Sequence, residues 1–244
     1  DNMNDNLAQQ PILSLYSTFP PSVPQGNFLL SNTQENGLAF DRANALPEEN
    51  QPWTPDNSSL DESEKAEGFI TLFDGITTKG WIPLSQNGKG FVVKDQSLQR
   101  VQGGGSIRTV ERFGDFILRL DFMIEPNGNS GVQVRCPRAN RQSKIGFEVQ
   151  ILGDYGFPPS PTSTGSIYNV IAPTANASNP AGEWNSLEIT CHGSLVKINL
   201  NGRQVQDLNF DNYEELKYRL RDGFIILTDH GNFAAYRNIR IKKL

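Results

Sequence analysis

The chain has 244 residues, 22 glycines, 15 prolines and a formal net charge of −5, a length that fits one large β domain or two small ones. The acidic balance argues against nucleic acid as a partner, because phosphate binding needs a basic surface. No run of about 18 apolar residues is present, so the sequence predicts no membrane-spanning helix.

Residues 1–66 differ in composition from the rest of the chain. They are rich in Pro, Asn and Ser, and they carry two basic residues against ten acidic ones. Such a segment cannot bury enough apolar surface to fold alone, yet it contains apolar clusters at 11–16 and 28–30. We predict either an extended N-terminal arm, which covers the main domain or mediates self-association, or a flexible tether.

Residues 67–244 have the pattern of an all-β sandwich, in which short strands alternate with turn signals. Turn dipeptides such as Asn201-Gly202 supply the positive φ angles that tight turns need. One short helix is expected at 212–220, with Asp211 as its N-cap. Candidate strands lie at 69–73, 91–95, 97–101, 116–124, 131–136, 147–152, 186–191, 196–200, 203–206, 224–228 and 235–241.

The strand period of two residues separates a core face from a polar face. On the polar face we expect Gln133 and Arg135 from one strand and Glu148 and Gln150 from the next, pointing away from the core on a concave surface. Residues on the opposite face form the predicted core: Phe116, Leu118, Val132, Val134, Val149, Ile151, Leu187, Ile189, Ile198 and Ile225.

Glu148 and Arg135 allow two interpretations. They are either a cross-strand ion pair of about 0.2–1 kcal/mol, or a base beside a cation that stabilises developing oxyanion charge. Of the two histidines, His192 is expected at the surface in a hairpin turn. His230 lies in a turn at a strand end, next to Asp229, where catalytic groups often project into a cleft.

No metal-ligand spacing, nucleophile motif or phosphate-binding glycine loop is present, so the sequence predicts neither a metal site nor a cofactor. The two cysteines, Cys136 and Cys191, both have the strand position of core residues. Buried free thiols are the expected state. A disulfide is the alternative if their Cα atoms lie within about 7 Å.

Several motifs, taken in order, resemble the DUF1080 family of 3-keto-disaccharide hydrolase domains. They cover about residues 67–244 and comprise FITLFDG with Gly80-Trp81, FGDF at 113–116, GNSGVQVR at 128–135, FEVQIL at 147–152, TGSIY at 164–168, GEWN at 182–185, and Asp229-His230-Gly231 with Arg237-Asn238-Ile239.

The resemblance implies a concanavalin A-like jelly roll that hydrolyses 3-keto-glycosides in secreted, periplasmic or outer-membrane-anchored proteins, often of Bacteroidetes. It implies Glu148, His230 and Arg135 as catalytic residues. It implies Asn129, Gln150 and Tyr168 as substrate-binding residues. The family has an aspartate directly after the EVQIL stretch, whereas here Gly153 precedes Asp154, so Asp154 is displaced by one residue.

Three classes of function follow from these observations. The leading one is an enzyme that removes a proton beside a ketone and eliminates the glycosidic oxygen, with Glu148 or His230 as base and the other as acid. The second is a carbohydrate-binding module without catalysis. The third is a surface scaffold organised by the N-terminal arm.

Overall fold

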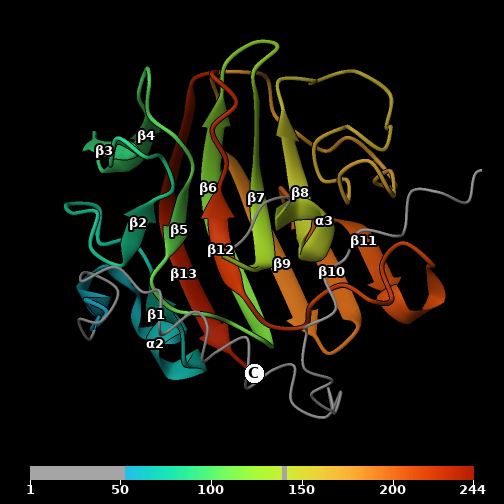
Figure 1. Ribbon diagram of the computed structural model, residues 1–244, viewed down its shortest axis with the longest axis horizontal. Helices are drawn as coiled ribbons and strands as arrows, with labels where there is room; N and C mark the ends of the chain where they lie inside the picture. The colour runs from blue at the N-terminus through green and yellow to red at the C-terminus, as the bar shows by residue number, and fades with distance from the viewer. Residues whose placement is uncertain (1–52, 139–141) are drawn as a thin grey trace, which may run out of the picture. The chain divides into compact units, whose positions relative to one another are not determined.

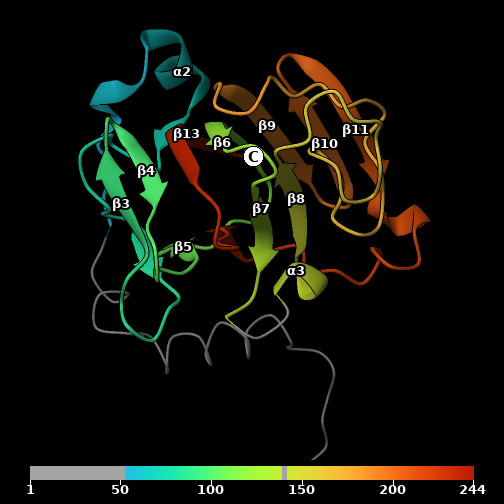
Figure 2. The ribbon, with the colours of Figure 1, turned by 90° about the horizontal axis from the view of Figure 1, so that it is seen from above.

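The computed structural model describes residues 53–138 and 142–244, which form two antiparallel sheets lying face to face (Figures 1 and 2). One sheet has the order β11 (Arg203–Asn209), β10 (Leu195–Leu200), β9 (Asn185–His192), β6 (Phe116–Ile124), β13 (Ala234–Lys243), β4 (Ser97–Arg100) and β3 (Phe91–Lys94), with β1 (Ile70–Thr71) also paired to β13. The other has the order β2 (Trp81–Pro83), β5 (Ile107–Thr109), β12 (Phe224–Leu227), β7 (Asn129–Cys136) and β8 (Phe147–Leu152). The all-β sandwich predicted from the sequence is confirmed.

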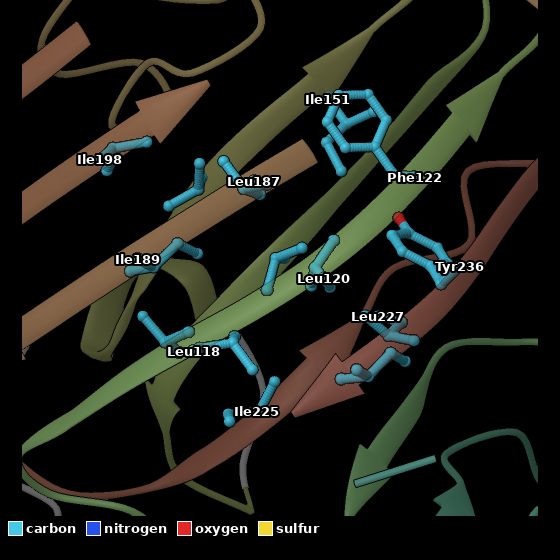
Figure 3. Close-up of a cluster of buried hydrophobic side chains, with 14 of the residues drawn as sticks. Leu118, Leu120, Phe122, Ile151, Leu187, Ile189, Ile198, Ile225, Leu227 and Tyr236 are labelled. Atoms are coloured by element: carbon cyan, nitrogen blue, oxygen red, sulfur yellow. The ribbon is translucent and has the colours of Figure 1, made fainter. Parts of the chain in front are cut away.

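The core lies between the sheets, and strict alternation of apolar residues builds it. Along β6, every second residue from Phe116 to Ile124 is buried. Figure 3 shows side chains from β6, β9, β10 and β13 meeting Ile151 of β8 and Ile225 and Leu227 of β12. All ten predicted core residues belong to this buried cluster. The prediction that their side chains point into the core is therefore confirmed.

Part of the segment assigned to the N-terminal arm packs on the sandwich. The described portion, 53–66, contains the 3-10 helix η2 (Asn57–Ser59) and most of helix α2 (Glu62–Glu67). The Asn57 side chain accepts a hydrogen bond from the main chain of Thr71 at 2.9 Å, and Glu64 forms an ion pair with Arg240 at 2.6 Å. The remainder of the predicted arm, 1–52, lies outside the described residues.

The helix expected at 212–220 is wrong. The structure has the 3-10 helix η3 (Phe210–Asn212) followed by consecutive turns. Tertiary contacts override the local helical signal here. Leu216 is fully buried, and Arg219 donates to the carbonyls of Ser143 and Gly146 beside the short helix α3 (Gln142–Ile145).

A β-bulge at the end of β7 changes the direction of two side chains. Cys136 pairs with Phe224 and Gln133 pairs with Ile226, so two residues of β7 oppose one residue of β12. Arg135 has φ of +53°, a left-handed conformation that breaks the strand alternation. From this point on, period-two reasoning assigns side chains to the wrong face.

Candidate active site

The outer face of the five-stranded sheet, which points away from the core, carries a row of side chains that is polar except for Ile226. The register places Arg108 of β5 beside Ile226 of β12, Ile226 beside Gln133 of β7, and Gln133 beside Glu148 of β8. On the other side of β8, the main chain of Tyr168 donates to the carbonyl of Glu148 at 2.9 Å. Because its neighbours Phe147 and Val149 belong to the core cluster, strand alternation places Glu148 on the outer face, as predicted.

Three side chains surround the carboxylate of Glu148. Gln133 donates from Nε2 to Oε2 at 3.2 Å, and the Thr228 hydroxyl lies 3.4 Å from Oε1. Nε2 of His230 lies 3.9 Å from the same Oε1, beyond hydrogen-bond range but close enough for strong electrostatic interaction. Oε2 is thus held by Gln133 of the neighbouring strand, while Oε1 faces His230.

His230 is the more accessible partner, with 44% of its side chain exposed against 4% for Glu148. The Glu148 carboxylate raises the pKa of His230 above its ordinary value, Asp229 adds to this, and partial burial opposes it. The pair therefore favours an imidazolium facing a carboxylate, an arrangement suited to one proton donor and one proton acceptor.

Asn129 and Gln150 form a second polar pair on the same face. The Gln150 amide donates from Nε2 to Oδ1 of Asn129 at 3.1 Å, which directs Nδ2 of Asn129 and Oε1 of Gln150 elsewhere. No hydrogen bond between described residues takes up these two atoms, so the pair presents one donor and one acceptor to a ligand. The main chain of Asn129 is held by Asn232, in the loop that follows His230.

Arg135 is not part of this site, and its expected position beside Glu148 is wrong. The bulge turns its fully buried side chain toward the other sheet. The guanidinium donates to the carbonyls of Gly114 and Gly193 and forms an ion pair with Asp115 at 2.9 Å. Burial lowers the pKa of Arg135 from its ordinary value, although Asp115 opposes this. Its contacts are those of a structural link between sheets.

The same bulge affects one of the cysteines. Cys191 lies in the core cluster as expected, whereas Cys136 is buried on the opposite side of its sheet, with Sγ 3.9 Å from Oε1 of Gln133. The core-facing prediction for Cys136 is therefore wrong. Both cysteines are free thiols.

Asp154 lies at a loop base away from the Glu148 carboxylate. It accepts hydrogen bonds from the main chain and hydroxyl of Thr164, and Asn176 donates to its carbonyl. These contacts fix the loop that follows β8. Asp154, which stands one residue later than the aspartate of the family, therefore stabilises this loop.

Sequence reasoning did not select Gln133, Thr228 or Gly131 as site residues. Strand parity had placed Gln133 on the correct face, whereas nothing in the sequence pointed to Thr228. Within 53–138 and 142–244, no group of three or more His, Cys, Asp or Glu residues is placed to hold a metal ion. No helix in those ranges is long and apolar enough to cross a bilayer.

Comparison with known proteins assigns this sandwich to the carbohydrate-active domains of the glycoside hydrolase type. The chain belongs to the 3-keto-alpha-glucoside-1,2-lyase-like domain family, whose pattern matches residues 68–242. It is 23% identical over 237 residues to a 3-keto-disaccharide hydrolase of Bacteroides thetaiotaomicron, covering 76% of this chain and 82% of that protein.

Solved structures agree with this assignment. A proposed glycosyl hydrolase from Parabacteroides distasonis superposes with a TM-score of 0.66 at 28% identity, covering 76% of this chain and 98% of that one. The carbohydrate-binding module CBM66 from Bacillus subtilis superposes with a TM-score of 0.50 at 15% identity, covering 67% and 96% of the two chains. The latter likeness concerns the fold alone, and it agrees with the jelly roll that the sequence resemblance implied.

Proposed function

We propose that this domain cleaves 3-keto-glycosides by removing the proton at C2 and eliminating the substituent at C1. The observation that carries the proposal is the approach of Glu148 Oε1 to His230 Nε2 at 3.9 Å on the outer face. Membership of the 3-keto-alpha-glucoside-1,2-lyase-like family supports it, as does the 3-keto-disaccharide hydrolase relative.

Glu148 acts as the general base in this proposal. A ketone at C3 makes the C2 proton acidic, and Oε1 of Glu148 accepts that proton. The C2–H electron pair then forms the C2–C3 double bond of an enediolate, with negative charge on the C3 oxygen. Because Gln133 holds Oε2, the carboxylate presents Oε1 in a fixed direction.

His230 acts as the general acid. Its raised pKa keeps the imidazole protonated over a wider pH range, so it can donate a proton to the glycosidic oxygen as the C1–O bond breaks. The C3 carbonyl reforms and a C1–C2 double bond appears, which releases the alcohol. Addition of water, with OH at C1 and H at C2, then completes a net hydrolysis. The elimination alone is a lyase reaction.

The remaining predicted residues serve binding. Nδ2 of Asn129 is the donor that we assign to the C3 oxygen, where a hydrogen bond strengthens as charge develops. Oε1 of Gln150 and the partly exposed Tyr168 orient ring hydroxyls by hydrogen bonding and stacking. Arg135 has no part in this arrangement, because its guanidinium is engaged at the other sheet.

The decisive experiment is cleavage of a 3-keto-disaccharide in deuterated water. We expect deuterium at C2 of the product, and we expect Glu148→Gln to lower kcat by about 10²–10⁴-fold while the disaccharide still binds. Glu188→Gln is the matched control, since Glu188 is also a strand carboxylate in an ion pair, with Arg119, but on the other sheet. Cleavage without deuterium at C2 contradicts the elimination route. Binding without turnover by the unmodified chain indicates a carbohydrate-binding module.

We propose that the protein is located in the bacterial envelope or outside the cell, as the family resemblance implies, and cell fractionation tests this location.

Self-association through the N-terminal arm is tested by light scattering on the full chain and on residues 53–244. The truncation begins at 53 because Trp53 packs against Gly80. An equal number of chains per particle in the two proteins contradicts that role of the arm.

A further inference from the structure

Gly131 lies directly under the carboxylate of Glu148. A Cβ atom at this position would lie 2.2 Å from Oε1 of Glu148 and 3.0 Å from both Cδ and Cγ of the same residue. The three nearest atoms thus all belong to one side chain. The space that Oε1 occupies exists because Gly131 has no side chain.

The backbone gives no other reason for glycine here. Gly131 is an interior residue of β7 and is absent from the positive-φ residues, so an L-amino acid fits its conformation. Its carbonyl accepts the main-chain N–H of Thr228 at 3.0 Å, and the Thr228 hydroxyl lies 3.3 Å from the same carbonyl. Because this strand is anchored, a clash at Gly131 is relieved by movement of Glu148 and not of the main chain.

Two other close-packed glycines, Gly146 and Gly223, differ in this respect. A Cβ at Gly146 or Gly223 would meet main-chain atoms at 2.5 Å and 2.3 Å, which only a backbone shift can relieve. At Gly131 the obstacle is the end of a flexible side chain. Alanine at position 131 therefore displaces a functional group and leaves the fold in place.

We propose that Gly131 is a positioning residue that sets the location of Glu148 Oε1 opposite His230. Gln133 holds Oε2 from the neighbouring position in the sheet, and Gly131 leaves the volume that Oε1 fills. The consequence for turnover rests on the proposed elimination reaction, whereas the placement of the carboxylate is measurable without it.

The test is Gly131→Ala, with Gly114→Ala as the matched control. A Cβ at Gly114 would have its nearest neighbour at 3.5 Å, an ordinary contact. In Gly131→Ala we expect the His230 pKa, followed by NMR titration of the imidazole, to fall toward about 6.5. We expect kcat for a 3-keto-disaccharide to fall by about 10²–10⁴-fold. The control variant keeps both values.

A Glu148→Ala background separates positioning from other effects. There, Gly131→Ala is expected to leave the His230 pKa unchanged, because no carboxylate remains to be displaced. An equal fall in both backgrounds overturns the proposal, as does an unchanged pKa in the single variant. If Gly131→Ala folds only in the Glu148→Ala background, this rescue of folding itself demonstrates the clash between a Cβ at position 131 and the Glu148 carboxylate. If the unmodified chain does not cleave 3-keto-glycosides, the proposed function fails, and the titration still decides the role of Gly131.

Discussion

The guanidinium of Arg100 meets the carboxylate of Asp229 at 2.9 Å, and this ion pair fixes the turn that carries His230. The same carboxylate oxygen accepts the main-chain N–H of Gly231 at 2.7 Å, while the N–H of Asp229 donates to Ser106. Both charged side chains are largely buried, with 17% and 7% exposed. The position of His230 therefore depends on a cation from another strand.

Arg100→Gln is expected to raise the His230 pKa further. Without the guanidinium, the negative charge of Asp229 acts on the imidazole uncompensated. The free energy of unfolding should fall by about 1–3 kcal/mol, between the values typical of surface and buried pairs. NMR titration and urea unfolding measure the two effects. Arg221→Gln, which breaks the more exposed pair with Asp211, should leave the His230 pKa unchanged, and an unchanged pKa in Arg100→Gln contradicts the prediction.

Stability should depend on pH through His230. Its pKa is raised in the folded protein, so the folded state binds the proton more tightly than the unfolded chain does. The stabilisation is fully present below about pH 6.5, the ordinary value, and is lost as the pH rises through the raised pKa. Urea unfolding of the unmodified chain and of Glu148→Gln on both sides of this range measures the difference. A difference that grows with rising pH contradicts the sign.

Arg135→Ala should damage stability and spare catalysis. It removes a fully buried cation and leaves the carbonyls of Gly114 and Gly193 without their donor, so the free energy of unfolding should fall by about 3 kcal/mol or more. Urea unfolding checks this, and kcat of the folded variant should stay within a few-fold of the original. Lost turnover with unchanged stability would restore Arg135 as a catalytic residue.

Gly223→Ala should destabilise the bulge of β7. A Cβ there would lie 2.3 Å from the carbonyl carbon of Arg135 and 2.5 Å from the nitrogen of Cys136, and overpacking of this kind costs about 1–3 kcal/mol. Gly114 follows Phe113, which pairs with Gly223 in an isolated bridge, so Gly114→Ala is a nearby comparison. Thermal unfolding of the two variants distinguishes them, and equal midpoints contradict the argument.

Much of the fold was predictable because the core follows a local rule. Period two alone assigns Leu118 and Val149 correctly, since each stands in an uninterrupted strand. The same rule fails at Arg135, where Val132 to Cys136 alternates in sequence but a bulge intervenes in the structure. The bulge depends on partners distant in the chain, Gly223 among them, and no local pattern encodes them.

The candidate site was predictable to a different degree. Strand parity placed Glu148 and Gln150 on one face, but no spacing rule relates Glu148 to His230, which is 82 positions later. The family resemblance supplied that pairing, and the structure brings the two together. Thr228 and Gly131 could be recognised only from the structure. Thr228 contacts the Glu148 carboxylate, and Gly131 leaves the space that Oε1 of Glu148 occupies.

The segment that presents Tyr168 also closes the edge of its sheet. β8 is the last strand of the five-stranded order. On its outer edge, the carbonyl of Glu148 accepts from Tyr168, the carbonyl of Gln150 accepts from Gly165, and the N–H of Gln150 donates to Ser166. An uncovered edge is a template for pairing with a second molecule. Under the proposed function, substitutions of the Tyr168 side chain would change which sugar is bound, whereas shortening of this segment would expose the strand edge and favour intermolecular aggregation. The proposed ligand preference and the solubility of the domain would then constrain the same few residues.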